Sequence, residues 1–168
     1  RQANVKVVQG VGAAQTLTFR GNYYSEDSNV TYSGLRQDEF TADPRANPFS
    51  NDFFYADRHG ASATHAIAFS GNVAMTTNLY WSSFKRHWWR QSSNSAQRPN
   101  DSADPLCATM GNLNTTCGNE GRLREYYNWG VEPRVSLYHR AFGLASETDF
   151  GVRAHFENQD RLQENGAT

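Results

Sequence analysis

The chain has 168 residues, with 16 lysines and arginines, 17 aspartates and glutamates, and a net charge of -1. This balance excludes the basic surface by which proteins bind nucleic acid or an anionic membrane surface. No apolar run approaches the roughly 20 residues of a membrane-spanning helix. The chain begins Arg-Gln-Ala-Asn, without a starting methionine, and we expect it to be a piece of a larger protein.

The N-terminal third predicts one β-hairpin followed by a long loop. Residues 4–9 form a short β-like run, residues 15–24 alternate between apolar and polar side chains, and a glycine-rich turn lies near residues 10–14. Two such runs around a tight turn are typical of a hairpin. The segment from 25 to 54 is polar and interrupted by Gly and Pro, so a long loop is expected there.

The middle of the chain repeats this order. Strand character returns at residues 58–69, a Ser-Gly-Asn turn covers 70–72, and a second alternating run follows at 73–84. Residues 90–121 are again polar and rich in Ser, Asn, Asp and Pro, which predicts a second long loop.

The two cysteines, Cys107 and Cys117, both lie in this second polar segment. In an oxidising compartment they would close a local disulfide loop worth roughly 3 kcal/mol. In a reducing compartment they would stay as two thiols. A zinc site is disfavoured because a second ligand pair does not accompany them.

The clearest strand pattern lies at residues 127–139 and is repeated at 148–159, around a short turn at 141–143. A soluble antiparallel strand also alternates, but each run covers the roughly 9–11 residues that a tilted strand needs to cross a bilayer. The aromatic pair Tyr127 and Trp129 lies near one end of the apolar side, where a membrane-interface girdle is expected.

The order of elements predicts an all-β fold of about six antiparallel, up-and-down strands from a transmembrane β-barrel. In such a barrel the short connections are periplasmic turns, here near 10–14, 70–72 and 141–143, and the long ones are extracellular loops, here 25–54 and 90–121. Connections in a compact soluble sandwich usually run only about 2–6 residues.

Short motifs spread over nearly the whole chain resemble the TonB-dependent outer-membrane receptors. They include Asn-Tyr-Tyr-Ser-Glu at 22–26, Trp-Trp-Arg-Gln-Ser-Ser-Asn-Ser at 88–95 and Leu-Asn-Thr-Thr-Cys-Gly-Asn at 113–119. Gly-Val-Glu-Pro-Arg at 130–134 and Asp-Phe-Gly-Val-Arg-Ala-His-Phe at 149–156 are similar to the ferric dicitrate branch of that family.

The resemblance implies part of a 22-stranded barrel in the bacterial outer membrane, without the N-terminal plug of the family. Such receptors bind a ferric chelate, here ferric dicitrate, at extracellular loops, and import it when the TonB complex drives rearrangement of the plug. The implied partners are the chelate, the TonB complex and outer-membrane lipid. The ferric chelate is the transported ligand, and a cofactor is not expected.

The resemblance also implies ligand-binding residues. In the ferric dicitrate branch, arginines at the extracellular ends of two consecutive strands contact the anionic chelate, because a guanidinium binds carboxylate in a bidentate manner. These positions match Lys85 and Arg86 on one strand and Arg124 on the next. Alternation places only one of Lys85 and Arg86 inward, and with Tyr80 and Ser82 inward it is Arg86. The alternative is that these are solvated charges at the barrel rim.

Tryptophans and inward charges complete the candidate residues. Of Trp88 and Trp89, alternation turns one inward, where it could stack on the ligand, whereas Trp81 and Trp129 are expected to anchor the girdle. For the inward charges we favour a structural ladder of cross-strand pairs over a conduction surface; these are Glu132, Arg134, Arg153 and Glu157.

Two other functions are consistent with parts of the pattern, and a third is not. A passive porin-type channel shares the barrel, and a soluble β-sandwich that binds glycans through tryptophans shares the alternation. An outer-membrane enzyme would need a carboxylate or Ser/His constellation, and catalysis has no support in the sequence.

Overall fold

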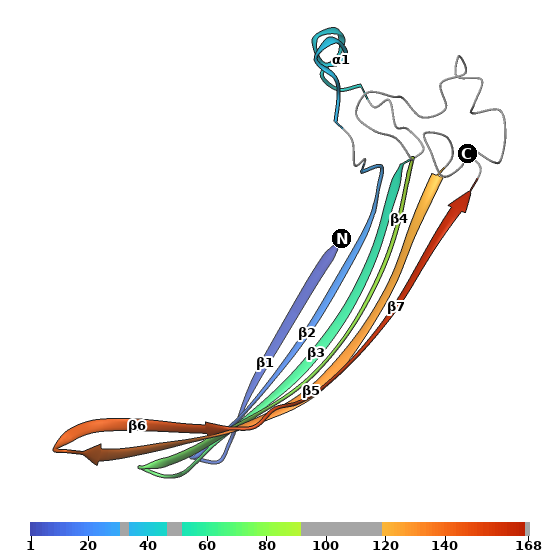
Figure 1. The fold of residues 1–168 in the computed structure, drawn as a ribbon. Coiled ribbons are helices and arrows are strands. Elements are labelled where there is room, and N and C mark those ends of the chain that lie inside the picture. Colours follow the sequence, from blue (N-terminus) through green and yellow to red (C-terminus); the bar gives the residue numbers. More distant parts are fainter. Residues whose placement is uncertain (31–33, 47–51, 92–118, 167–168) are drawn as a thin grey trace. The chain divides into compact units, whose positions relative to one another are not determined.

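Long alternating runs separated by short polar turns form nearly all of the regular structure. The computed structural model describes residues 1–30, 34–46, 52–91 and 119–166 (Figure 1). In chain order the elements are β1 (Gln2–Val11), β2 (Gln15–Ser28), α1 (Gln37–Ala42), β3 (Phe53–Ser70), β4 (Val73–Gln91), β5 (Asn119–Ala141), β6 (Leu144–Gly151) and β7 (Ala154–Gly166).

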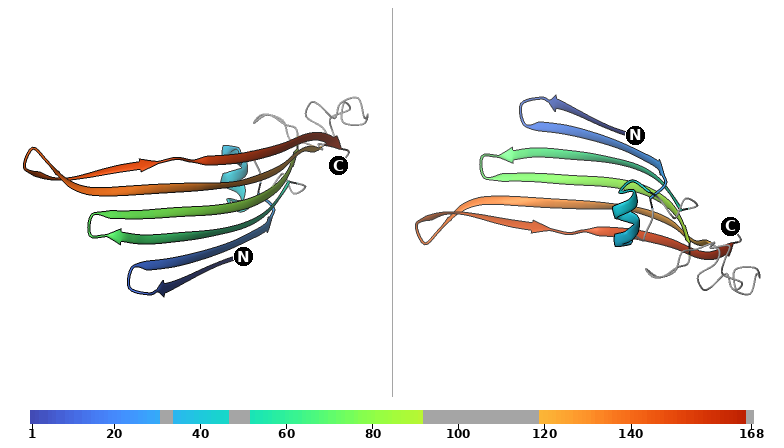
Figure 2. Two further views of the ribbon diagram at one scale, coloured as in Figure 1. Left: turned by 90° about the horizontal axis from the view of Figure 1, so that it is seen from below. Right: turned by 90° about the horizontal axis from the view of Figure 1, so that it is seen from above.

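The described strands form one open, seven-stranded sheet with an antiparallel, up-and-down arrangement, which confirms the all-β prediction. Strands β1 to β6 follow one another across the sheet in chain order, and β7 also pairs with β5 (Figure 2). Short connections at residues 12–14, 71–72 and 142–143 join the hairpins. A complete 22-stranded barrel stays a prediction.

The expected count of about six strands differs from the seven observed because the last alternating run is interrupted. Strand β6 ends at Gly151 and β7 begins at Ala154, and both pair with β5. At the break, the Val152 amide donates to the carbonyl oxygen of Pro133 on β5 at 3.1 Å. Proline has no N–H to return a ladder bond, and prolines within sheets are therefore associated with bulges and edges.

The segments expected to be long loops contain more regular structure than their polar composition suggested. Within 25–54, β2 continues to Ser28, β3 begins at Phe53, and α1 lies between them. The side chain of Glu39 accepts a hydrogen bond from the Arg36 amide at 2.8 Å, which satisfies one free N–H at the start of α1. Of the second segment, residues 92–118, including Cys107 and Cys117, lie outside the described residues.

The strands contribute to two compact units, which are described separately. The turn unit consists of residues 1–24, 58–84 and 126–159. The loop unit consists of residues 25–57, 85–125 and 160–168, of which the described part is considered below.

The described residues contain almost no apolar core. Those classed as buried are three glycines, one alanine and two carboxylates: Gly60, Gly121, Gly130, Ala56, Asp52 and Glu120. The large apolar side chains of the sheet are therefore mostly exposed. No helix in the described ranges has the length and apolar character needed to span a membrane.

Candidate functional site

One face of the sheet in the turn unit is apolar. The register of β1 and β2 sets Val7 opposite Phe19 and Val5 opposite Gly21, so these residues share a face. We call the following residues the apolar face: Val5, Val7, Phe19, Ala61, Ala63, Leu79, Trp81, Tyr127, Trp129 and Phe156. Eight of the ten are large, and all eight are exposed; Val5 is 62% and Leu79 54% exposed.

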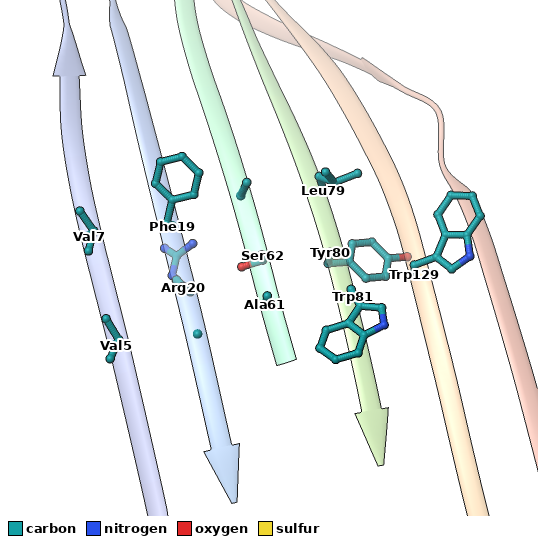
Figure 3. A pocket seen from close by; sticks show the side chains of 12 residues that line it. Val5, Val7, Phe19, Arg20, Ala61, Ser62, Leu79, Tyr80, Trp81 and Trp129 are labelled. Carbon is teal, nitrogen blue, oxygen red and sulfur yellow. The ribbon is translucent and has the colours of Figure 1, made fainter. Parts of the chain in front are cut away.

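The apolar face contains a shallow groove of about 530 Å³ (Figure 3). Its side chains come from β1, β2, β3, β4 and β5, and include Leu79, Trp81 and Trp129. Aromatic contacts continue across β4, β5 and β7: the ring centroids of Trp81 and Tyr127 lie 6.5 Å apart, and those of Trp129 and Phe156 lie 6.0 Å apart. A patch of this kind on a protein surface marks contact with an apolar medium or partner.

Polar groups from β4, from β7 and from the break before β7 meet on the turn unit's other face. The Tyr80 hydroxyl lies 2.7 Å from Nδ1 of His155 and accepts a hydrogen bond from Nε of Arg153 at 3.1 Å. Tyr80 reaches them across Gly130 of β5, where a Cβ atom would lie only 2.4 Å from the hydroxyl oxygen. Only glycine leaves this space open, which explains a glycine in the middle of a long strand.

The expected ladder of inward charges takes a different form in the structure. Glu132 and Arg134 approach each other at 3.9 Å along β5, and Glu157 lies 3.7 Å from His155 along β7. Arg153 donates a hydrogen bond to the Tyr80 hydroxyl, and the charge of Glu132 on β5 also acts on its guanidinium. The structure thus has pairs along one strand and an aromatic partner, together with one charge interaction with a neighbouring strand.

In the loop unit, two ion pairs fix the register of β4 against β5. The Nζ atom of Lys85 lies 2.8 Å from Glu125, and Nη2 of Arg90 lies 3.0 Å from Glu120. The two basic residues are five positions apart on β4, and their two glutamate partners are five positions apart on β5 in the opposite direction. Neither strand therefore has a bulge between the two ion pairs. Arg86 is therefore opposite Arg124, on the face that Lys85 does not share.

The same alternation gathers arginines on one face of the loop unit. We call this set the arginine cluster: Arg86, Trp88 and Arg90 of β4, and Glu120, Arg122 and Arg124 of β5. The cluster contains four arginines and one glutamate, and that glutamate pairs with two of the arginines, Arg90 and Arg122. Two further charged residues belong to neighbouring segments: Asp52 directly precedes β3, whose Phe53 stacks on Trp89 of β4, and Arg161 belongs to β7.

Glu120 is the centre of the cluster's contacts. Its two carboxylate oxygens separately accept hydrogen bonds from Nη2 of Arg90 at 3.0 Å and from Nε of Arg122 at 2.8 Å. Burial raises the pKa of the Glu120 carboxyl, but the hydrogen bond from Arg122 and the charges of both arginines outweigh burial and hold the pKa below its ordinary value. The carboxylate is therefore ionised at neutral pH.

Two predicted ligand residues, Arg86 and Arg124, belong to this cluster and have donors to spare. The Nε atom of Arg86 is buried and makes no hydrogen bond with the described residues. Arg124 uses Nη1 to donate to the carbonyl oxygens of Leu123 and Leu162 at 3.2 and 3.1 Å. These bonds tie its side chain to β5 and β7 and leave its other nitrogens available.

The remaining predicted residues divide between the two faces. Trp88 lies in the arginine cluster, where Cζ of Arg90 is 5.9 Å from its ring centroid. Lys85 and Trp89 lie on the opposite face. The hydrogen bond and the charge of Glu125 raise the pKa of Lys85, and Trp89 stacks on Phe53 with ring centroids 6.3 Å apart.

Sequence reasoning missed Arg90, Arg122 and Glu120. Arg90 follows Arg86 at a spacing of four and Arg122 precedes Arg124 at a spacing of two, so the period of alternation already assigned both arginines to the face of the predicted ones. The role of Glu120 had no such signal, because it depends on a partner 30 residues away.

The described parts of the chain contain no group of three or more His, Cys, Asp or Glu side chains arranged to hold a metal ion. No protein-family model matches the chain, and a search of curated proteins returns no significant match. The resemblance to TonB-dependent receptors therefore stays a prediction.

Proposed function

We propose that this chain is a segment of an outer-membrane β-barrel receptor that binds and imports an anionic ferric chelate, with ferric dicitrate as the expected ligand. The observation that carries the proposal is the two-faced sheet. In the turn unit the apolar face exposes aliphatic and aromatic side chains, and in the loop unit the arginine cluster brings four arginines together around one glutamate.

The apolar face supports contact with lipid. A single sheet with exposed Val, Leu, Phe and Trp side chains on one face lacks the packing that stabilises a soluble domain. In a barrel wall, such side chains face hydrocarbon while alternate residues face a polar interior. A sandwich needs a second sheet packed on the first, whereas all seven described strands belong to one sheet.

The arginine cluster supports an anionic ligand. A guanidinium binds a carboxylate through two parallel hydrogen bonds, and charge-assisted bonds of this kind are about twice as strong as neutral ones. Ferric dicitrate presents carboxylates around the iron, so several arginines on one face can bind it together. In this proposal Arg86 and Arg124 contact the chelate, Trp88 packs beside it, and the TonB complex supplies energy through a plug outside this chain.

Titration of the full-length protein in detergent with ferric dicitrate tests the binding step. We expect Arg86→Ala and Arg124→Ala each to weaken binding by about 1.5 kcal/mol or more, roughly tenfold. Lys85→Ala is the matched control, because it removes an equal charge from the opposite face and should leave affinity nearly unchanged. Equal effects at all three positions would contradict the assignment of faces.

Uptake of labelled chelate into cells separates an energised receptor from a passive porin. The proposed receptor stops importing when the proton-motive force is collapsed, whereas a porin continues along the concentration gradient. Uptake that persists after the proton-motive force is collapsed would agree with a barrel but would contradict energised import by a receptor.

A further inference from the structure

Resting on the proposed function, we infer that Glu120 is a positioning residue, which holds Arg90 and Arg122 as a fixed pair of guanidinium groups for a ligand carrying two or more carboxylates. The inference concerns residues that the resemblance did not indicate. It follows from the contacts that Glu120 makes within the arginine cluster.

The position of Glu120 between two arginines is a specific arrangement. Each carboxylate oxygen bonds a different guanidinium, so one side chain fixes two. The Glu120 side chain is 12% exposed and that of Arg90 17%, so solvent screens this pair less than a surface ion pair. Without the carboxylate, the two guanidiniums would repel each other, and Arg122 would lose the hydrogen bond that orients it.

Donors remain available after these bonds are made. Arg122 donates to Glu120 through Nε, and its two terminal nitrogens make no hydrogen bond with the described residues. Its side chain is 36% exposed, so a ligand can reach it. The Nε atom of Arg86 also makes no hydrogen bond with the described residues, but it is buried, so a ligand could meet only the terminal nitrogens of that side chain.

These donors define the class of ligand. Planar forks held in fixed orientation suit planar carboxylates, since each fork can bond both oxygens of one group. Four arginines on one face favour a ligand with several negative charges. A chelate with two or more carboxylates fits both conditions, whereas a neutral or singly charged chelate leaves arginines unpaired and desolvated.

Glu120→Gln tests this role because a positioning role and a simple effect of net charge predict opposite changes in the affinity for the ligand. The substitution removes a negative charge, so long-range electrostatics alone would strengthen binding of an anion. If Glu120 positions the arginines, affinity for ferric dicitrate should instead fall about tenfold, because two flexible side chains must then be ordered by the ligand. Glu125→Gln is the control, because it removes the same charge from the opposite face.

The measurement is calorimetric titration of the full-length protein with ferric dicitrate, after thermal melts have verified that each variant is folded. Weakening by Glu120→Gln but not by Glu125→Gln supports the inference. Unchanged or tighter binding by Glu120→Gln, with a wild type that binds normally, overturns the positioning role and leaves the proposed function intact. A wild type that does not bind ferric dicitrate overturns both.

A double-variant cycle supplies a second readout if Glu120→Gln melts early. Arg122→Lys keeps the charge but loses the fork, and we expect about the same tenfold loss. If Glu120 acts through Arg122, the double variant should bind no more weakly than the single ones, since both remove the same geometry. Losses that multiply would show independent effects and overturn the inference.

Discussion

Replacing Leu79 by arginine tests whether the apolar face contacts lipid. Leu79 is 54% exposed and lines the groove of the turn unit with Trp81 and Trp129. In water, a substitution at so exposed a position changes stability by only about 0.5 kcal/mol in either direction. In a bilayer the same arginine must be buried in hydrocarbon or distort the lipid around it.

The expected cost follows from the position of Leu79 along β4. The outward residues of this strand are apolar or uncharged from Val73 to Trp81, and Thr77 is the middle of that run. Leu79 lies two residues away, about 7 Å along the strand, or about 5 Å in depth for a strand tilted by ~45°. Arginine at the midplane of a barrel costs about 2–4 kcal/mol, so we expect about 2–3 kcal/mol at this depth.

The assay compares urea-induced unfolding of the full-length protein in lipid vesicles for wild type, Leu79→Arg and Thr76→Arg. Thr76 is exposed on the other face of the same strand, so its substitution introduces the same charge into the polar interior. We expect Thr76→Arg to cost less than 1 kcal/mol, an order-of-magnitude figure for polar surfaces. Equal costs for the two variants would refute the lipid-facing assignment.

Three further measurements address the fold and the cluster. Gly130→Ala should destabilise the fold by about 1–3 kcal/mol, because the new Cβ would lie 2.4 Å from the Tyr80 hydroxyl. Gly21→Ala is the control, because a Cβ there would have no atom within 4 Å and should change stability little. Denaturant titration compares the two variants. Phe142 has φ 50° and is fully exposed, so Phe142→Asn should raise the melting temperature through a gain of about 1 kcal/mol. The arginines lower the pKa of the Glu120 carboxyl in the folded protein. The contribution of this carboxylate to folding stability is therefore complete above its unfolded-state pKa of about 4.3, and it is lost as the pH falls through the lower pKa of the folded state. The stability difference between wild type and Glu120→Gln should therefore shrink in unfolding titrations over that pH range.

The sequence determined the fold class and the faces of the strands. Alternation has a period of two along a single strand, so it depends only on nearby residues and can be recognised without a partner. The run from Tyr127 to His139 indicated a strand with an apolar and a polar side, and β5 covers it in the structure. The same rule separated Arg86 from Lys85, and the ion pair of Lys85 with Glu125 agrees with that separation.

Tertiary structure alone decided which side chains meet across strands. The contact of Arg90 with Glu120 spans 30 residues and that of Tyr80 with His155 spans 75. Both depend on the register, and a slip of one residue exchanges the two faces of a strand. The break between β6 and β7 likewise depends on Pro133 in the neighbouring strand. Local alternation therefore assigns a side chain to a face, whereas pairing between distant segments decides its partner and its chemistry.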